Sequence, residues 1–303
     1  MLDFYKLQIF ITVAQEGSFS AAAEHLFITQ SAVSQHMKEL EKRLGRTLFQ
    51  RGRRGVKLTS HGEILLRYAQ EIVALLDQAE NALIDVEKLS EGRLSIGATP
   101  GISIYLVPDW VQRFRAQYPQ LSVALKTGVT AQIVADVLEQ QIDLGFVEGE
   151  LEDLKPSRLN VVALEEVEQM VIVGFKHPWW DKQEVQIEDL HRQSLIVRPP
   201  DSQSRIWLDQ TLSRYGVEPI IGAEFDNLES IKRSVISGHC LTILPKYVVQ
   251  SEADQGLLHL VPIIGQPLNR VLKLITMRDV PFSALERAFL KVLSEDYNVL
   301  ALI

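Results

Sequence analysis

Apolar residues return at helical intervals from the start of the chain. A first helix is predicted over Phe4–Glu16, ended by Gly17, because four apolar positions lie three or four residues apart: Phe4, Leu7, Ile11 and Ala14. A second, shorter helix is predicted over Ser20–Leu26, where three consecutive alanines would let another helix approach closely. The pattern indicates a compact start made of short helices.

The third predicted helix lies in TQSAVSQHMKELEKRLG, residues 29–45, with Thr29 as a suitable N-cap. One face is an apolar stripe that would hold it on the first two helices: Val33, Met37, Leu40 and Leu44. The other face carries hydrogen-bonding groups and no acidic side chain until Glu41: Gln30, Ser31, Ser34, Gln35 and Lys38. Two short helices joined by a tight turn form a helix-turn-helix, and Gln and Ser on its second helix can bind base edges in a major groove. The pattern therefore predicts a DNA-reading helix.

The segment LFQRGRRGVKLT, residues 48–59, is typical of a β-hairpin with cations at its tip. Such a wing places positive side chains near phosphates or an adjacent minor groove. Its cations are therefore expected to position DNA rather than read bases: Arg51, Arg53, Arg54 and Lys57. A charged solubilising turn is the alternative interpretation of the hairpin alone.

A long helix is predicted after the hairpin, with Ser60 and Glu63 as a capping box. It carries an apolar seam of about four heptads over roughly 45 Å: Leu65, Tyr68, Ile72, Leu75, Ala79, Ala82, Val86 and Leu89. A hairpin is too small to bury that seam, so a second copy of the chain is the expected partner. Packing against the C-terminal part of the same chain is the alternative.

From residue 92 onward, strand-like and helix-like runs alternate, which predicts an α/β body with one or two mostly parallel sheets. Strands are predicted at 94–98, 121–127, 143–147, 169–175, 194–197, 220–225, 257–261 and 271–277, and helices at 102–117, 130–140, 204–215, 228–237 and 281–296. Small polar residues follow several strands, where helix N-termini can bind an anion. The segments in question are 99–103, 127–130, 199–204 and 225–227. Each alone is more often an ordinary helix cap, but their recurrence favours a site for a small anion or carboxylate.

Charge is unevenly distributed along the chain. Residues 1–62 carry a net charge of +4, within a total of −8, so the remainder carries −12. A basic end on an acidic body is typical of a nucleic-acid-binding head attached to a part with another task. A single cysteine excludes an internal disulfide and fits a reducing cytoplasm. No segment is apolar enough for a membrane span, and the N-terminus lacks the basic region of a signal peptide.

Motifs for catalysis or metal binding are missing. The sequence contains no G-x-S-x-G, no phosphate-binding P-loop and no G-x-G-x-x-G. Its seven histidines are dispersed, without an H-x-x-x-H or a pairing with cysteine. We therefore expect no catalytic residues, no metal and no cofactor, and a small-molecule effector, a carboxylate or other small anion, as the ligand.

The chain resembles the LysR-type transcriptional regulators. The resemblance is strongest over residues 10–51, FxxVAxxGSFSAAAEHLFITQSAVSQHMKELEKRLGRTLFQR, and LTSHG at 58–62. Further along, GRLSIGAT at 92–99, DLGFVEG at 143–149 and SVISGHCLTILP at 234–245 follow in the same order. Many members have Arg in place of Gln35, a difference that bears on base preference. Many also have Pro in place of Ser60, a difference that bears on a helix cap.

The resemblance implies a fold of three parts. An N-terminal winged helix-turn-helix (1–62) and a linker and dimerisation helix (63–91) precede an α/β regulatory domain (92–303) similar to periplasmic binding proteins. The regulatory domain would have subdomain I at 92–162 and 267–303 and subdomain II at 163–266, with the chain crossing near 161–164 and 265–268. The implied partners are double-stranded promoter DNA and the chain itself, as a homodimer and in many members a homotetramer, with RNA polymerase as a further partner; no membrane is implied.

The resemblance also assigns residues by matching position. Contacts to DNA would come from the reading helix, its surroundings and the wing: Ser20, Thr29, Gln30, Ser31, Ser34, Gln35, Lys38, Arg51, Arg53 and Arg54. A co-inducer between the subdomains would meet Thr99, Pro100, Gly101, Ser103, Thr130, Ser202, Phe225 and Asn227. Glu148 lies next to that cleft, so a dianion would require its carboxylate to be turned away or protonated.

Two other classes of function remain open at this stage. One is an enzyme or solute carrier built on the same body, which measurable turnover would support. The other is a nucleoid-type architectural protein without an effector. The head of 62 residues and the missing catalytic motifs argue against the first. The polar reading face, poor in Lys and Arg, argues against the second, because sequence-indifferent binders depend on phosphate charge.

Overall fold

The computed structural model describes residues 3–52, 55–83, 91–151, 157–265, 268–278 and 280–299, without the side chains at 51, 52, 74, 75 and 77–83. The chain divides into two compact units, Met1–Leu83 and Ile84–Ile303.

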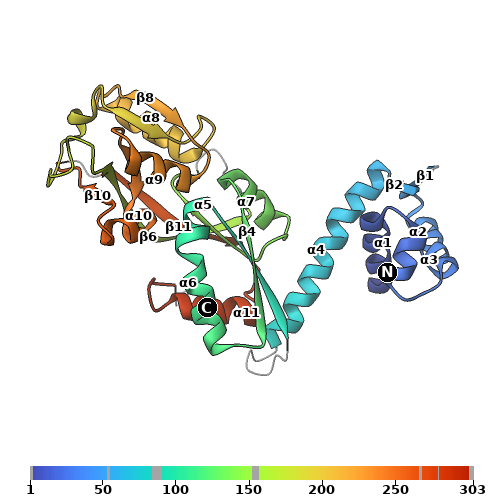
Figure 1. Ribbon diagram of the computed structural model, residues 1–303. Coiled ribbons are helices and arrows are strands. Elements are labelled where there is room, and N and C mark those ends of the chain that lie inside the picture. Colours follow the sequence, from blue (N-terminus) through green and yellow to red (C-terminus); the bar gives the residue numbers. More distant parts are fainter. Residues whose placement is uncertain are drawn as a thin grey trace. The chain divides into compact units, whose positions relative to one another are not determined.

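The first unit is a three-helix core with a hairpin and a long helix (Figure 1). Its elements are α1 (Phe4–Glu16), α2 (Phe19–His25), α3 (Gln30–Leu44), β1 (Phe49–Gly52), β2 (Gly55–Leu58) and α4 (Ser60–Leu83). Gly17 ends α1 in the left-handed conformation, and the Thr29 side chain caps α3 by accepting from Ala32 N–H, as predicted. The core is apolar and shared by all three helices; its largest fully buried side chains include Phe10, Leu7, Ile9, Met37 and Leu40.

Three local predictions for this unit are wrong. The second helix begins one residue before Ser20, at Phe19, because Ser18 accepts from two N–H groups of its first turn. Ser60 is already helical, so the predicted capping box does not form; Thr59 Oγ1 accepts from Gly62 N–H at 3.1 Å instead. Leu44 is 37% exposed and lies outside the core, because α3 ends there.

The second unit is built on a seven-stranded mixed sheet in the order β10-β6-β11-β5-β3-β4, with β9 beside β6, and a separate pair β7-β8. The strands are β3 (Gly92–Ala98), β4 (Leu121–Thr127), β5 (Leu144–Glu148), β6 (Leu159–Gly174), β7 (Ser194–Val197), β8 (Ile220–Glu224), β9 (Thr242–Pro245), β10 (Leu258–Val261) and β11 (Leu268–Met277). The helices are α5 (Pro100–Tyr105), α6 (Val107–Gln117), α7 (Thr130–Leu138), the 3₁₀ helix η3 (Ile187–Leu190), α8 (Gln203–Arg214), α9 (Leu228–Ser237), α10 (Lys246–Asp254) and α11 (Ala284–Leu293).

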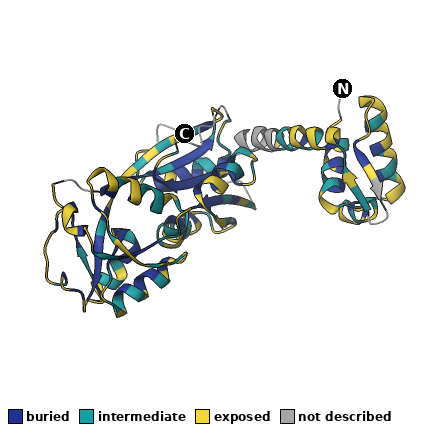
Figure 2. Ribbon diagram, turned by 90° about the horizontal axis from the view of Figure 1, so that it is seen from above, coloured by how far each residue is buried: buried dark blue, intermediate teal, exposed yellow. Residues whose placement is uncertain are grey.

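Buried side chains form separate cores toward the two ends of this unit. The first lobe (β3–β5, α5–α7 and α11) packs around Trp110, Phe114, Phe146 and Phe289. The second lobe (β7–β10, α8–α10) packs around side chains such as Val171, Leu195 and Ile231. Figure 2 shows buried residues along the strands of the unit, with exposed ones on its outer helices and loops. Two lobes on one sheet leave room for a site where they meet.

The long strands β6 and β11 connect the lobes. They pair antiparallel from Leu159↔Met277 to Gln169↔Leu268, after which β6 continues beside β9 and β10. β6 passes from the first core, at Val167, to the second, at Val171. The resemblance implied a crossing near 161–164, and the subdomain limits stay a prediction.

The prediction of a mostly parallel sheet is wrong. Among the strands that the structure describes, β3–β4, β3–β5 and β7–β8 pair parallel, whereas β6 and β11 pair antiparallel with each neighbour. The sequence predicted this strand only from 169, because Glu165, Glu166 and Glu168 interrupt the apolar pattern before it. These three glutamates are exposed, whereas Val162 and Leu164 are half-buried and Val167 is buried. The predicted helix at 102–117 is broken at Leu106, because Pro108 cannot donate to the preceding turn.

Candidate functional site

The polar face of α3 is open to solvent, as the spacing predicted. Gln30, Ser31, Gln35 and Lys38 are exposed and Ser34 is half-buried, whereas the opposite face buries Val33, Met37 and Leu40. Thr29 Oγ1 lies 2.9 Å from Ser31 Oγ, which holds these two hydroxyls together at the N-terminal end of the helix. Ser20, on α2, is exposed as well. The arrangement offers donors and acceptors without burying any of them.

The sequence predicted that Glu41 would be the first acidic side chain on the polar face of α3, but Glu39 lies there instead. Glu41 turns inward, where Oε1 accepts from Leu48 N–H at 2.7 Å and from Phe49 N–H at 3.3 Å. Glu39 is the exposed acid: it accepts from Gln35 Nε2 at 3.1 Å and pairs with Lys6 Nζ at 2.7 Å. Lys6, through that hydrogen bond, lowers the pKa of Glu39. The acid is therefore neutralised, and it orients the Gln35 amide.

The wing is docked on the helical core. Val56 N–H donates to Gly17 O at 2.8 Å, and a Cβ on Gly55 (φ +123°) would lie 2.4 Å from that same oxygen. Glycine is therefore required at 55 by both conformation and space. Lys57 is exposed on β2. Arg53, Arg54 and the side chain of Arg51 lie outside the described residues, so their expected contacts to DNA stay predictions.

Part of the predicted seam of α4 packs inside the first unit. Leu65, with Leu66 and Ala69, contacts the three-helix core. Tyr68 and Ile72 are 52% and 38% exposed, and Ile64 and Leu76 beside them are 52% and 40% exposed. The seam residues from Leu75 onward lie outside the described side chains. The described half of α4 thus carries an apolar face that this unit leaves uncovered.

A cavity of about 110 Å³ lies in the second unit between the first turns of α5, α7 and α8. The residues predicted for the effector that line it are Thr99, Pro100, Gly101, Thr130 and Ser202. Ser103, Phe225 and Asn227 do not. Ser103 Oγ donates to Pro100 O at 3.0 Å, and Asn227 Oδ1 caps α9 by accepting from Glu229 N–H at 2.8 Å. Phe225 packs against the core of the second lobe.

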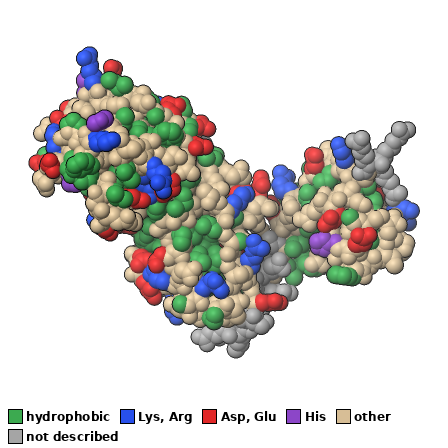
Figure 3. Space-filling model, in the orientation of Figure 1, with side chains coloured by type: hydrophobic (Ala, Val, Ile, Leu, Met, Phe, Trp, Pro, Cys, Tyr) green, Lys and Arg blue, Asp and Glu red, His purple; other side chains and the backbone are tan. Residues whose placement is uncertain are grey.

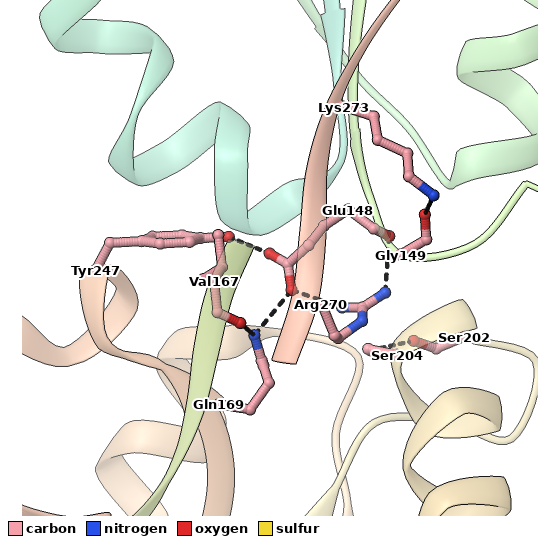
Figure 4. A network of polar contacts seen from close by, with 9 residues as sticks. All are labelled: Glu148, Gly149, Val167, Gln169, Ser202, Ser204, Tyr247, Arg270 and Lys273. Carbon is pink, nitrogen blue, oxygen red and sulfur yellow. Dashed lines mark hydrogen bonds and ion pairs between the residues drawn. The ribbon is translucent and has the colours of Figure 1, made fainter. Parts of the chain in front are cut away.

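The sequence did not indicate the polar network at the base of the cavity (Figure 4). Glu148, at the end of β5, is 6% exposed and accepts from three side chains. The donors are Arg270 Nη1 at 2.9 Å, Gln169 Nε2 at 3.1 Å and Tyr247 Oη at 2.6 Å. Burial raises the pKa of Tyr247 well above its ordinary value, so the hydroxyl stays a donor. Because Arg270 is beside it, Glu148 can remain in the cavity as a paired carboxylate.

Arg270 has capacity left for another acceptor. It is 8% exposed, donates to Glu148 O through Nη2 at 2.7 Å, and lies over the Trp207 ring at 5.4 Å from its centroid. Its Nε is buried and has no hydrogen-bond partner among the described residues. Ser202 Oγ and Ser204 Oγ, 2.8 Å apart, lie on the side of Arg270 away from Tyr247 (Figure 4). No side chain caps α8 at Ser202.

Two further arginines line the cavity. Arg205 is balanced by Asp209 and Glu224, at 2.9 and 3.0 Å. Arg198 donates through Nη1 to Asp226 O, and within the described parts of the chain no carboxylate forms an ion pair with it. Burial lowers the pKa of Arg198, against the opposing effect of Asp226 and Asp201. Arg198 is the cation of the cavity whose charge is least compensated.

A second polar contact joins the lobes beside the cavity. Tyr105 Oη, from α5, donates to Glu229 Oε1 of α9 at 2.6 Å. Lys232 is 3% exposed; its Nζ lies 4.8 Å from the Tyr105 ring centroid, 2.7 Å from Glu229 and 2.6 Å from Glu252. With Tyr247–Glu148, this gives two tyrosine hydroxyls that each bind a glutamate of the other lobe.

Within the described residues, no group of three His, Cys, Asp or Glu side chains is placed to hold a metal ion, and no helix is long and apolar enough to cross a membrane. On the face of the second unit seen in Figure 3, acidic and basic side chains are interspersed.

Comparison with protein families matches nearly the whole length of the chain. Residues 4–63 match the bacterial regulatory helix-turn-helix proteins of the lysR family, and residues 87–298 match the LysR substrate binding domain. A probable RuBisCO transcriptional regulator of Guillardia theta is 34% identical over 274 residues, 89% of this chain and 88% of its own length. A protein of the same description from Emiliania huxleyi is 33% identical over 273 residues, 89% of this chain and 87% of its own.

Solved structures share the fold. A point variant of full-length OxyR from Pseudomonas aeruginosa has a TM-score of 0.73 at 23% identity and covers 98% of this chain and 94% of its own. Full-length CbnR in complex with its target DNA has a TM-score of 0.62 at 20% identity and covers 97% of this chain and 100% of its own.

Proposed function

Since this chain belongs to the LysR family of transcriptional regulators, we propose that it reads one DNA sequence through α3 and is controlled by a small anion bound in the cavity of the second unit. The family binds DNA and regulates transcription. The reading of bases, the dimer and the effector are argued from this chain's own residues, and the operator to test first is taken from the names of its relatives. We place its action in the cytoplasm, where promoter DNA and small metabolites meet.

The reading face supports specific binding. Gln30 and Ser31 present amide and hydroxyl groups that can pair with base edges, while the cations lie on the wing and toward the middle of α3. Such a division separates base contacts from phosphate contacts. A promoter fragment of RuBisCO genes is the first operator to test, because the relatives described above are named as regulators of those genes.

Replacing Gln30 with Ala tests the base-reading role. Loss of one bidentate contact should cost ~1–3 kcal/mol on the operator and little on scrambled DNA. The matched control is Lys57→Ala on the wing, which should weaken both duplexes and lower the salt dependence by about one charge. Equal losses of Gln30→Ala on both duplexes would contradict base reading by α3.

Dimerisation through α4 is the second part of the proposal. The exposed apolar side chains along α4 support it: Ile64, Tyr68, Ile72 and Leu76. A second copy of the same helix would cover them, and family members are commonly dimers of such dimers. Ile72→Glu should lower the molecular mass in sedimentation, whereas Glu71→Gln should leave it unchanged.

The charged side chains that line the cavity are the reason for proposing an anion as the effector. Glu148 and Arg270 cancel, Arg205 faces two carboxylates, and Arg198 is the cation of the cavity without an ion-pair partner among the described residues. The first N–H groups of a helix lack intrahelical partners, and at α7 and α8 no side chain caps them. Together with Arg198, Arg270 Nε and the Ser202 hydroxyl, these donors suit a compact anion.

Thermal unfolding of the full chain against a panel of small carboxylates, phosphates and inorganic anions tests this choice. A ligand at a hundred times its dissociation constant should add ~2.7 kcal/mol to the free energy of unfolding. Arg198→Gln should weaken that ligand, and Arg214→Gln, on the far end of α8, should not. A cation or a neutral compound that binds more tightly than every anion would contradict the proposal.

A further inference from the structure

Phe27 is the most exposed large apolar side chain among the described residues. It lies in the turn between α2 and α3 and is 96% exposed. Its neighbours in sequence, Leu26 and Ile28, both pack against the core of the first unit. The residues on either side of Phe27 are anchored in the core, so the conformation of the turn itself directs the Phe27 side chain into solvent.

The backbone at Phe27 is unfavourable for a phenylalanine. Its φ is +54°, in the left-handed region that glycine or asparagine usually occupies at the end of a helix. The conformation is fixed by the turn, because Phe27 N–H donates to Glu24 O at 3.2 Å and Ile28 N–H donates to Ala23 O at 3.0 Å. Gly17 and Gly45 end α1 and α3 at φ +62° and +64°. A glycine at 27 would relieve the strain and remove the exposed ring, so folding does not account for this residue.

The position of Phe27 indicates what covers it. It comes two residues before Thr29, the N-cap of α3, so its Cα lies within roughly 7 Å of the start of the reading helix. The same end carries Gln30 and Ser31, and the major groove is about 12 Å wide. A side chain at this place can reach the groove that this helix end would enter. Thymine is the base that presents an apolar group there, its C5-methyl.

We propose that Phe27 contacts a thymine methyl group at the edge of the operator and so adds an apolar determinant to the hydrogen bonds of α3. This inference rests on the proposed reading of DNA by α3. Strained backbone is commonly retained where it serves a function. Here it holds an aromatic ring in water until DNA covers it.

The test uses the full chain and a duplex enriched from a random pool by the wild-type protein. Phe27→Gly should keep or raise the melting temperature, because glycine adopts this φ freely. The same variant should bind the duplex roughly tenfold more weakly, the size of one base contact. The matched control is Leu44→Ala, an exposed apolar residue at the other end of α3, which should bind as the wild type does.

Uracil in place of thymine identifies the contact within that duplex. At one thymine, loss of the methyl should weaken the wild type several-fold and leave Phe27→Gly unchanged. Wild-type affinity in Phe27→Gly, or equal sensitivity of both proteins at every thymine, would overturn the inference while Gln30→Ala still tests α3. A lower molecular mass of Phe27→Gly in sedimentation without DNA would overturn it too, since the ring would then cover a second copy of the chain. A wild-type protein that enriches no sequence would refute the proposed function itself.

Discussion

Lys232 is a buried cation of the second lobe that also contacts the Tyr105 ring of the first lobe, and its replacement by methionine has a predictable cost. The methionine keeps most of the length and packing of the stem but removes the ammonium group. The lost interactions are the ion pairs at 2.7 and 2.6 Å to Glu229 and Glu252 and the contact with the Tyr105 ring.

The three lost interactions differ in weight. Glu229 is 50% exposed, so its pair with Lys232 contributes at most about 1 kcal/mol. Glu252 is 19% exposed and its Oε2 is buried without a partner among the described residues, so removal of the cation leaves a poorly solvated carboxylate. The cation–π contact adds about 0.5–2 kcal/mol. We expect Lys232→Met to lower the free energy of unfolding of the second unit by about 3 kcal/mol.

Denaturant unfolding of the full chain, followed by tryptophan fluorescence, measures this loss, because all four tryptophans lie in the second unit. The double variant Lys232→Met with Glu252→Gln should recover about 1–2 kcal/mol, since it leaves no unpaired carboxylate. Arg233→Met, the next residue on α9, serves as the control. A loss below about 1 kcal/mol for Lys232→Met, or no recovery in the double variant, would refute the idea that a desolvated ion pair between α9 and α10 stabilises the second lobe.

Three further predictions address packing and pH. In the first unit, Gly62→Ala should cost about 2 kcal/mol by denaturant unfolding, since a Cβ there would lie 2.3 Å from Leu48 O. In the second unit, Gly149→Ala should cost about 2–3 kcal/mol in the same measurement, because its φ is +98° and a Cβ would lie 2.4 Å from Arg270 Nη2. Burial raises the pKa of Glu286 from 4.5 to about 7, so the wild type should lose stability as pH rises through that interval. Glu286→Gln should avoid a loss on the order of 3 kcal/mol over the same interval, measured by unfolding at a series of pH values.

Each of these has its own control or contrary result. For Gly149→Ala the control is Gly216→Ala, where φ is +64° and a Cβ would meet nothing within 4 Å, so it reports the backbone cost alone. Parallel stability curves of wild type and Glu286→Gln between pH 4.5 and 7 would show that Glu286 titrates normally. A Gly62→Ala protein as stable as the wild type would mean that the hairpin and α4 can separate without cost.

The first unit was predictable because its determinants are local. The apolar spacing of α1 and α3, the cap at Thr29 and the glycines around the wing act over a few residues, and the predicted elements form with ends shifted by one or two positions. The capping box at Ser60 failed because Thr59 competes for the same N–H groups and also donates to Thr47 O at 2.7 Å, a contact set by the hairpin.

The sequence by itself determined the helix-turn-helix with its polar reading face and the apolar positions of the following helix, whereas the anion site at the helix starts stays a prediction. These follow from periodicity and capping, which a single segment expresses. Only the tertiary structure decided the chemistry of the cavity. Glu148, Gln169, Tyr247 and Arg270 come from β5, β6, α10 and β11, and their charges and donors are matched only once two long antiparallel strands bring the lobes together. From the sequence, the Glu148 carboxylate was expected to repel an anion. In the structure Arg270 neutralises its charge, and the sequence did not show this because the two residues lie 122 positions apart in the chain.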